Sequence, residues 1–247
     1  MIAIISDVHG NLEALTAVLD RIGGARTIYC AGDIVGYGPN PNECCRLLRE
    51  HDVQCVRGNH DHICATLEDG EPAGKEAKKS FQWTHEQLTD ENIEWLRSLP
   101  LQLDVDGMSM VHGAPGSRRE NLHAYVLDYY YSDERYEALL EQVPGKRLVL
   151  GHTHIALSHG VNSRILNPGS VGQPRDGDWR ASYATIEDIR YGFRFVPSLK
   201  ASFSMTPDVV HFHRAEYDME ETARKIEEQT DLPSRLVKML RHGGLHV

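Results

Sequence analysis

Short apolar runs alternate with polar, glycine-rich loops through the first sixty residues of the chain. The runs span residues 1–6, 27–30 and 53–56, and the segments between them, 12–24 and 42–51, carry apolar residues at helical spacing. Strands that alternate with helices in this way predict a parallel sheet built from βαβ units. Ligands bind such sheets at the carboxyl ends of the strands, which is where the polar loops lie.

The middle of the chain adds elements of a different kind. Residues 73–98 have the pattern of a helix, and Asp106-Gly107 separates two alternating segments, as in a hairpin. A second helix is expected over 132–143, before the apolar run 147–150, and residues 155–197 have the pattern of further antiparallel strands. The chain therefore has the element pattern of an α/β protein.

The C-terminal part is more strongly charged than the rest of the chain. Its pattern predicts a strand over 209–217 and helices over 218–229 and 233–241. We expect residues 1–200 to form the main domain, which carries the functional site. Residues 201–247 are expected to form an appendage of strand and helices that packs on the same domain.

Side chains with metal-binding groups follow five of the predicted strands. They are Asp7, His9, Asp33, Asn59, His60, His112, His152 and His154. A mixed set of nitrogen and oxygen donors suits manganese, iron or zinc and lacks the thiolates of a structural zinc site. The set is large enough for two ions, and a pair of neighbouring ions is a known device for hydrolysis at phosphorus.

Each of these motifs is weak when it stands alone. A DxH pair, a GD turn or a GNH turn is common on protein surfaces, and a lone histidine is often a hydrogen-bonded core residue. Their occurrence together, each after an apolar strand, is what favours a metal site. In the pair Asp7 and His9, the spacing puts both side chains on one side if the chain leaves its strand in an extended conformation.

The motifs resemble, in content and order, those of the calcineurin-like metallophosphoesterase superfamily. They are DVH (7–9), GDIVGYGP (32–39), GNHD (58–61), His112 and GHTH (151–154). Two segments, GYGPNP (36–41) and NPGSVGQPRDGD (167–178), are similar to the compact bacterial and archaeal, phosphodiesterase-like branch. The resemblance extends from residue 1 to about residue 178 and implies a four-layer α-β-β-α sandwich of two mixed β-sheets flanked by helices.

The resemblance also implies two divalent metal ions per chain, which would be manganese, iron or zinc, with manganese favoured. The first ion would be held by Asp7, His9 and His154. The second would be held by Asn59, His112 and His152, and Asp33 would bridge the two. Two imidazoles in one GHTH loop would thus serve different ions of one dinuclear centre.

In the family that the motifs resemble, the histidine at His60 is catalytic and is not a ligand. As an imidazolium it would stabilise the charged transition state and protonate the leaving oxygen. A hydroxide that bridges the metals would attack phosphorus in line. Asp61 would orient a ligand or His60 from outside the ligand shell.

Two further residues are candidates for substrate contact. Arg57 matches an arginine of the phosphoprotein phosphatase branch, but a plain surface position at a strand end fits it equally well. Tyr37 lies beside Asp33 and would stack on a base, line the pocket or shape its turn. For the loop residues Asn167, Ser170 and Arg175, shaping of the loop is favoured over contact with substrate. These three are therefore not included among the predicted site residues.

The composition and net charge of the chain limit the kinds of molecule that it is expected to bind. A net charge of −10 over 247 residues argues against non-specific binding to nucleic acids or anionic membranes and against a nuclease with a basic surface. A phosphorylated substrate stays compatible, because bound metal ions supply local positive charge. Five cysteines without a CxxC spacing predict reduced, buried thiols and a cytoplasmic protein. No apolar stretch is long enough to cross a bilayer, and the charged tail is a candidate surface for a homodimer.

We therefore predict a hydrolase, a dinuclear metal-dependent phosphoesterase that cleaves a phosphodiester or nucleotide pyrophosphate bond. Its substrate would be a small phosphorylated molecule such as a nucleotide. One alternative is a phosphomonoesterase or phosphoprotein phosphatase. Another is a catalytically silent metal-binding scaffold of the same fold, which is disfavoured because none of the motif residues is missing.

Overall fold

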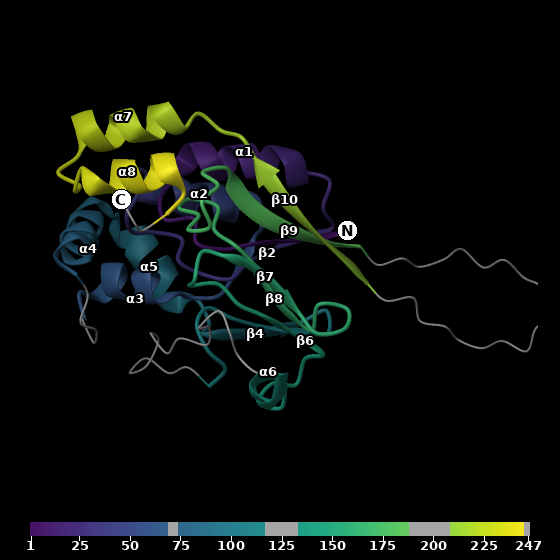
Figure 1. Cartoon of the computed structure of the whole chain (residues 1–247). Helices are drawn as coiled ribbons and strands as arrows, with labels where there is room; N and C mark the ends of the chain where they lie inside the picture. The colour runs from purple at the N-terminus through teal and green to yellow at the C-terminus, as the bar shows by residue number, and fades with distance from the viewer. Residues whose placement is uncertain (69–73, 117–132, 188–207, 245–247) are drawn as a thin grey trace, which may run out of the picture.

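The computed structural model describes residues 1–68, 74–116, 133–187 and 208–244, in which ten strands form two five-stranded sheets (Figure 1). Sheet A has the strand order β10-β9-β1-β2-β3, and sheet B has the order β4-β5-β6-β8-β7. The strands are β1 (Ile2–Ile5), β2 (Thr27–Cys30), β3 (Gln54–Cys55), β4 (Gln102–Val105), β5 (Met108–Val111), β6 (Arg147–Val149), β7 (Ala156–His159), β8 (Ile165–Pro168), β9 (Ala181–Glu187) and β10 (Val209–Ala215). The helices are α1 (Leu12–Ile22), α2 (Pro41–Glu50), α3 (Asn59–Thr66), α4 (Lys75–Gln87), α5 (Asp90–Ser98), α6 (Asp133–Leu140), α7 (Met219–Gln229) and α8 (Arg235–His242).

Both sheets are mixed, with a parallel centre. In sheet A, β1, β2 and β3 are parallel, and β9 and β10 run antiparallel beside β1. In sheet B, β5, β6 and β8 are parallel, and β4 and β7 add antiparallel edges. The predicted βαβ start and the hairpin at Asp106-Gly107 are confirmed. The expectation that all strands after residue 155 are antiparallel is wrong for β8, which pairs in parallel with β6, and residues 188–197 lie outside the described residues.

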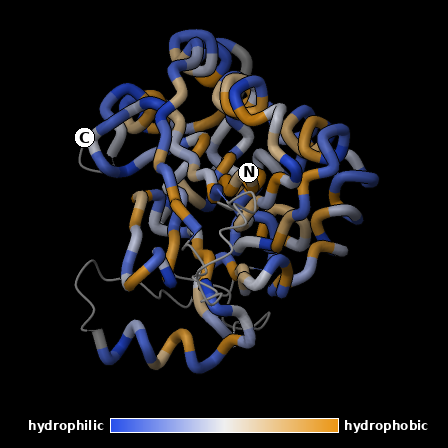
Figure 2. Tube along the Cα trace, turned by 90° about the vertical axis from the view of Figure 1, so that its right-hand side faces the viewer, coloured by the Kyte–Doolittle hydropathy of each residue, from blue (hydrophilic) through white to orange (hydrophobic). Residues whose placement is uncertain are grey.

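The side chains of the sheets divide the interior into three apolar layers. Ile4 of β1 faces the other sheet and packs with Met110 and Val149, whereas its neighbour Ile5 faces the helices and packs with Leu15 of α1. On the far side of sheet B, Tyr136 and Leu140 of α6 cover Leu148 and Ile165. Along the helices at the periphery, hydrophilic and hydrophobic stretches alternate (Figure 2). The order helix, sheet, sheet, helix confirms the expected four-layer sandwich.

Local signals explain where several helices begin. Asn11 caps α1 by accepting a hydrogen bond from the backbone N–H of Ala14, and Pro41 opens α2. The single helix expected over 73–98 is instead two helices, because Thr89 leaves the helical conformation and caps α5 through the N–H of Asn92. Within the described ranges, no helix combines the length and the apolar character that crossing a membrane requires.

All five cysteines lie in the apolar layer between sheet A and its helices. They are Cys30, Cys44, Cys45, Cys55 and Cys64, each buried and none in a disulfide. Burial raises the pKa of the Cys44, Cys45 and Cys64 thiols, and for Cys55 a hydrogen bond with Cys30 is the first cause of a raised pKa, with burial second. These four thiols are therefore neutral, and all five cysteines serve as packing residues.

The C-terminal part is joined to the sheet and to α1. Strand β10 pairs with β9 along its whole length, and α7 packs on α1 (Figure 1). The fully buried hydroxyl of Thr222 in α7 lies 3.1 Å from Asn11 Oδ1 and 2.8 Å from Glu13 Oε2, and Lys225 pairs with Glu13. The domain boundary expected at residue 200 lies outside the described residues.

Replacing the buried hydroxyl of Thr222 tests this attachment. The substitution Thr222→Val is expected to lower the free energy of unfolding by about 1–3 kcal/mol, because valine cannot donate the hydrogen bond that the buried Thr222 hydroxyl makes to Glu13 Oε2 or Asn11 Oδ1. Thr222→Ser keeps the hydroxyl and is the matched control, with a smaller loss. Urea unfolding of both variants measures the difference, and equal losses would show that the hydroxyl contributes nothing.

Candidate metal centre

The predicted ligands leave the two sheets at one common edge. Asp7 and His9 follow β1, Asp33 follows β2, Asn59 follows β3, His112 follows β5, and His152 and His154 follow β6. All seven side chains are buried, and His152, the most exposed of them, is 8% exposed. They meet because the parallel strands of both sheets end at this edge.

Five of these residues have a left-handed backbone. The φ angles are 53° at Asp7, 49° at His9, 54° at Asp33, 71° at His152 and 61° at His154. The extended exit assumed for the DxH pair is therefore wrong, and the chain turns sharply at each of these five residues. A left-handed residue other than glycine costs roughly 1–2 kcal/mol. Hydrogen bonds between the loops stabilise this left-handed backbone. They include those from Asp7 N to Gly32 O (2.9 Å) and from His152 N to the Asp7 carboxylate (3.1 Å).

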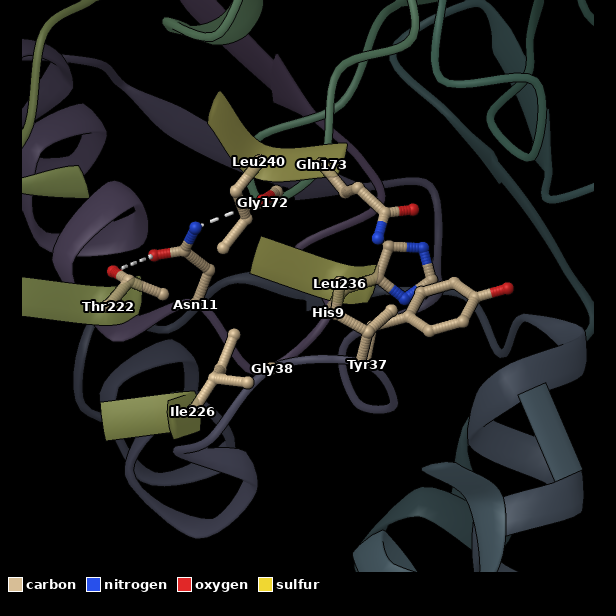
Figure 3. Close-up of a pocket in the computed structure, with 10 residues that line it drawn as sticks. All are labelled: His9, Asn11, Tyr37, Gly38, Gly172, Gln173, Thr222, Ile226, Leu236 and Leu240. Atoms are coloured by element: carbon tan, nitrogen blue, oxygen red, sulfur yellow. Dashed lines mark hydrogen bonds between the residues drawn. The ribbon is translucent and has the colours of Figure 1, made fainter. Parts of the chain in front are cut away.

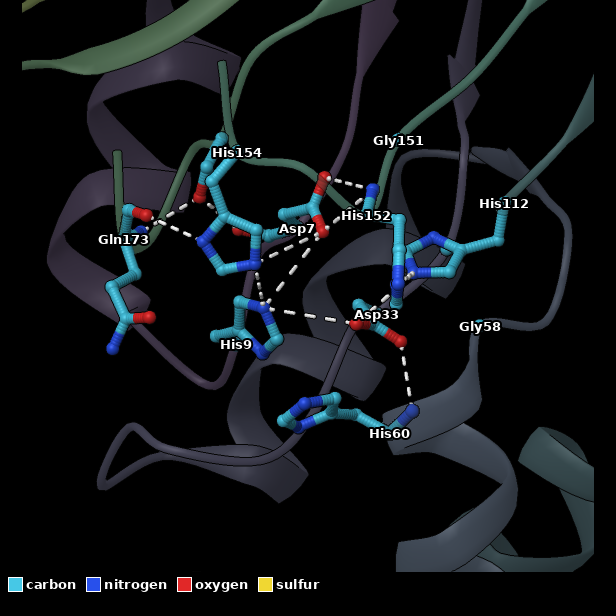
Figure 4. Close-up of polar contacts among 12 residues, drawn as sticks. Asp7, His9, Asp33, Gly58, His60, His112, Gly151, His152, His154 and Gln173 are labelled. Carbon is cyan, nitrogen blue, oxygen red and sulfur yellow. Dashed lines mark hydrogen bonds and ion pairs between the residues drawn. The ribbon is translucent and has the colours of Figure 1, made fainter. Parts of the chain in front are cut away.

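One half of the centre combines two carboxylates and two imidazoles (Figure 4). His154 Nε2 lies 3.3 Å from Asp7 Oδ1 and 2.9 Å from His9 Nε2. His9 Nε2 lies 3.8 Å from Asp33 Oδ2. The donor atoms of these four residues all lie within 4.8 Å of one another, which is compact enough for one ion.

The other half shares Asp33. Its Oδ2 lies 3.1 Å from His112 Nε2, and Asp33, His112 and His152 form a second group with donor atoms within 4.8 Å. His152 Nδ1 lies 2.9 Å from Asn59 Oδ1 and 3.2 Å from His112 Nε2. Asp33 thus belongs to both groups.

Backbone carbonyls fix the orientation of three imidazole rings. Nδ1 of His9 donates to Val35 O (3.3 Å), that of His112 to Ala31 O (2.7 Å) and that of His154 to Gln173 O (2.6 Å). A carbonyl oxygen only accepts, so Nδ1 carries the proton, and in the neutral rings of His9 and His154 the Nε2 lone pairs point at each other. Two lone pairs 2.9 Å apart repel, and a cation bound by both nitrogens would remove that repulsion.

Part of the cluster already has the charges that metal binding requires. Burial is the first cause that lowers the pKa of His9, His152 and His154, bringing His152 to about 3, so that these rings are neutral. Burial alone would raise the pKa of Asp33, but the charges of His112 and His60 outweigh it and hold that pKa well below its usual range. Neutral imidazoles and an ionised carboxylate are the forms that bind divalent metals. The exceptions are His112, for which burial is outweighed by the charge of Asp33, which raises the pKa to about 10, and Asp7, whose pKa burial raises to about 7.

His60 lies beside the first half of the centre without joining either group of donors. Its backbone N–H donates to Asp33 Oδ1 (2.9 Å) at the start of α3 (Figure 4). Its ring centroid is 4.7 Å from that of His9, 4.5 Å from that of Tyr37 and 4.6 Å from that of Phe81. The structure thus places the predicted catalytic histidine and Tyr37 together at the rim of the cluster.

Asp61 holds two loops together from behind. Its carboxylate accepts hydrogen bonds from the backbone N–H groups of Ile34 (2.8 Å), Val35 (3.1 Å) and Gly58 (2.9 Å). Burial, and secondarily the charge of Asp33, raise the pKa of Asp61 to about 6. These backbone groups belong to the loops that carry Asp33 and His60, so the Asp61 carboxylate links the two loops through their backbone.

Arg57 and Arg175 occupy different surroundings from those expected. The Arg57 guanidinium is buried and donates to the carbonyl of Arg97 at the end of α5 (3.0 Å). Arg175 instead joins the centre, because its backbone N–H donates to His154 O (3.1 Å) and its guanidinium to Gln173 Oε1 (3.2 Å). The glycine-rich NPGSVGQPRDGD loop, one of the segments behind the resemblance, was the available signal for Gln173 and Arg175.

A narrow pocket beside His9 has a wall that the sequence did not predict. His9, Tyr37 and Gln173 lie on one side of it, and Leu236 and Leu240 of α8 contribute apolar side chains from the tail (Figure 3). Its remaining lining residues are Asn11, Gly38, Gly172, Thr222 and Ile226. The C-terminal helices therefore reach the edge of the metal-ligand cluster.

Comparisons with known proteins agree with this geometry. The profile of the "Calcineurin-like phosphoesterase superfamily domain" matches residues 1–188. An uncharacterized protein of Methanocaldococcus jannaschii is 33% identical, over 92% of this chain and 91% of its own length. The crystal structure of a metallophosphoesterase from Sphaerobacter thermophilus is 33% identical, covers 98% of both chains and superimposes with a TM-score of 0.74.

Two further similarities are narrower. A hypothetical protein of Pyrococcus horikoshii has the same fold, with a TM-score of 0.79 over 99% of both chains at 24% identity. A symmetrical bis(5'-nucleosyl)-tetraphosphatase of Neisseria gonorrhoeae is 34% identical over 113 residues, which are 44% of this chain and 41% of that protein. The match thus spans less than half of the tetraphosphatase. On the profile match and the full-length relatives, the chain belongs to the calcineurin-like phosphoesterase superfamily.

Proposed function

We propose that the chain is a dinuclear metal-dependent phosphoesterase that hydrolyses a phosphodiester or nucleotide pyrophosphate bond. The observation that carries the proposal is the pair of buried donor groups that share Asp33, with His60 packed beside one of them. One group of oxygen and nitrogen donors suits one divalent ion, and two groups with a common carboxylate suit two neighbouring ions.

The donor atoms fit divalent metals by their chemistry. Asp7, His9 and His154 would hold one ion, whereas Asn59, His112 and His152 would hold the other. Asp33 would contact both. The facing Nε2 atoms of His9 and His154 are the strongest sign of fit, because the carbonyl-bound Nδ1 protons leave only lone pairs there. Manganese, iron and zinc all accept this donor set, and when bound they supply Lewis acidity and an activated water.

The remaining chemistry belongs to side chains of the chain itself. His60 is held at the rim of the cluster, where an imidazolium would donate a proton to the leaving oxygen. Tyr37 lies next to it and would border the substrate. Asp61 would keep His60 in place through the backbone of both loops.

The substrate class is supported by the sequence comparisons. The tetraphosphatase relative matches 113 residues at 34% identity, and it acts on a nucleotide with several phosphates. We therefore place phosphodiesters and nucleotide pyrophosphates ahead of phosphomonoesters. The net charge of −10 makes a polyanionic substrate dependent on local cations at the centre.

A comparison of two chromogenic esters tests the proposed function. Chelator-treated protein with manganese restored is expected to hydrolyse bis-p-nitrophenyl phosphate faster than p-nitrophenyl phosphate. The same protein without added metal is the control. Faster turnover of the monoester would instead identify a phosphomonoesterase, and no turnover of either ester would favour the scaffold.

The substitution Asp33→Asn tests the shared carboxylate. Because Asp33 lies in both donor groups, the variant is expected to lose both ions together after dialysis, as measured by elemental analysis. Asp104→Asn, on β4 and hydrogen-bonded to Ser109, is the control and should keep its metal. Loss of a single ion from the Asp33 variant would remove Asp33 from the bridging position.

The substitution His60→Ala separates catalysis from metal binding. The variant is expected to keep its metal and to lose turnover by ~10²–10⁴, which is the typical contribution of a positioned acid. His62→Ala, on the same helix and 3.6 Å from Glu68, serves as the control. If the His60 variant lost metal as well, His60 would be a ligand.

A further inference from the structure

The loop that follows β8 is fixed to the metal centre at many points. Ser170 Oγ donates to Asp7 O (2.7 Å), and the N–H groups of Val171 and Gly172 donate to Ser6 O and Asp7 O (both 2.9 Å). Asn167 Nδ2 donates to Gly151 O (2.8 Å), in the loop of His152 and His154. Asn167 and Ser170 thus shape the loop, as the sequence favoured, and they hold it rigidly against the cluster.

Arg175 is the arginine of this loop whose charge the loop does not neutralise. Asp176 pairs with Arg214, and Asp178 pairs with Arg180 at 2.7 Å, so both neighbouring carboxylates are already engaged. Arg175 forms no ion pair with a carboxylate among the described residues, and its buried Nε–H has no hydrogen-bond partner there. Its guanidinium donates a hydrogen bond to Gln173 Oε1.

The side chain of Gln173, which accepts a hydrogen bond from the Arg175 guanidinium, lines the pocket beside His9, so the guanidinium lies close to the cluster. Burial lowers the pKa of His154, and the charge of Arg175 is the second cause that lowers it. Burial raises the pKa of Asp7, and Arg175 opposes that rise. Its backbone N–H holds His154 O, so the residue sits directly beside one of the ligands.

We propose that Arg175 binds the substrate's phosphate, with Gln173 orienting its guanidinium. This inference rests on the proposed function and names the residue that recognises the phosphate. A guanidinium presents parallel N–H donors that match two phosphate oxygens, and a rigid loop lowers the entropy lost on binding. Arg57, for which the sequence left substrate contact and a surface position equally open, is buried and donates to the carbonyl of Arg97.

Titration with inorganic phosphate tests the proposal without requiring turnover. In manganese-loaded protein, Arg175→Gln is expected to weaken phosphate binding roughly ten- to a hundredfold, the range for a charge-assisted hydrogen bond. Metal content should match that of the parent. Arg180→Gln, on the same loop and paired with Asp178, is the matched control and should bind phosphate like the parent. Calorimetry measures the affinities, and elemental analysis measures the metal.

The conservative variant guards against a merely structural effect. Arg175→Lys keeps the charge but loses the paired donors, so its phosphate affinity should fall between those of the parent and Arg175→Gln at full metal content. Parental phosphate affinity in either Arg175 variant, or equal weakening in Arg180→Gln, would overturn the proposal. If the unsubstituted protein bound phosphate but hydrolysed neither ester, only the proposed function would be contradicted. The phosphate titration would still test whether Arg175 binds phosphate.

Discussion

The buried carboxylate of Asp33 is the charge around which the rest of the site is arranged. It lies in both donor groups, faces His112 at 3.1 Å and accepts the backbone N–H of His60 at 2.9 Å. An ionised carboxylate that is 1% exposed is costly to bury unless positive charge and donors surround it. The backbone donor of His60 reaches the carboxylate because the chain approaches it closely at position 58. A Cβ on Gly58 would overlap the Asp33 carboxylate. Glycine at position 58 is therefore required by close approach.

Much of this could be predicted from the sequence, because the relevant signals are local. Apolar runs followed by Asp, Asn or His located the ligands, and the parallel strands explain why residues as far apart as Asp7 and His154 meet. The left-handed backbone at Asp7 and His9 could not be predicted in the same way, since hydrogen bonds from other loops impose it. The helix break at Thr89 was missed because apolar spacing continues across it while the cap depends on one hydroxyl.

The arginines show a second limit. Arg57 stands next to a motif and Arg175 lies inside one, but neither position in the sequence tells where the long side chain points. Arg57 donates a hydrogen bond to the carbonyl of Arg97, which lies on α5, 40 residues further along the chain. The attachment of the C-terminal part is equally hard to predict from the sequence. The Asn11 side chain caps α1, donates to Gly172 O and lies 3.1 Å from Thr222 Oγ1, so it connects three segments of the chain. Such connections depend on the packing of the whole chain.

The five buried thiols have a consequence for oxidative chemistry. Oxidation by peroxide proceeds through the thiolate, and burial together with raised pKa values keeps Cys44, Cys45, Cys55 and Cys64 as thiols at neutral pH. None of the five is in a donor group of the centre. Peroxide is therefore expected to react slowly with the four cysteines of raised pKa, and an iron ion bound at the centre would be oxidised more readily than they are.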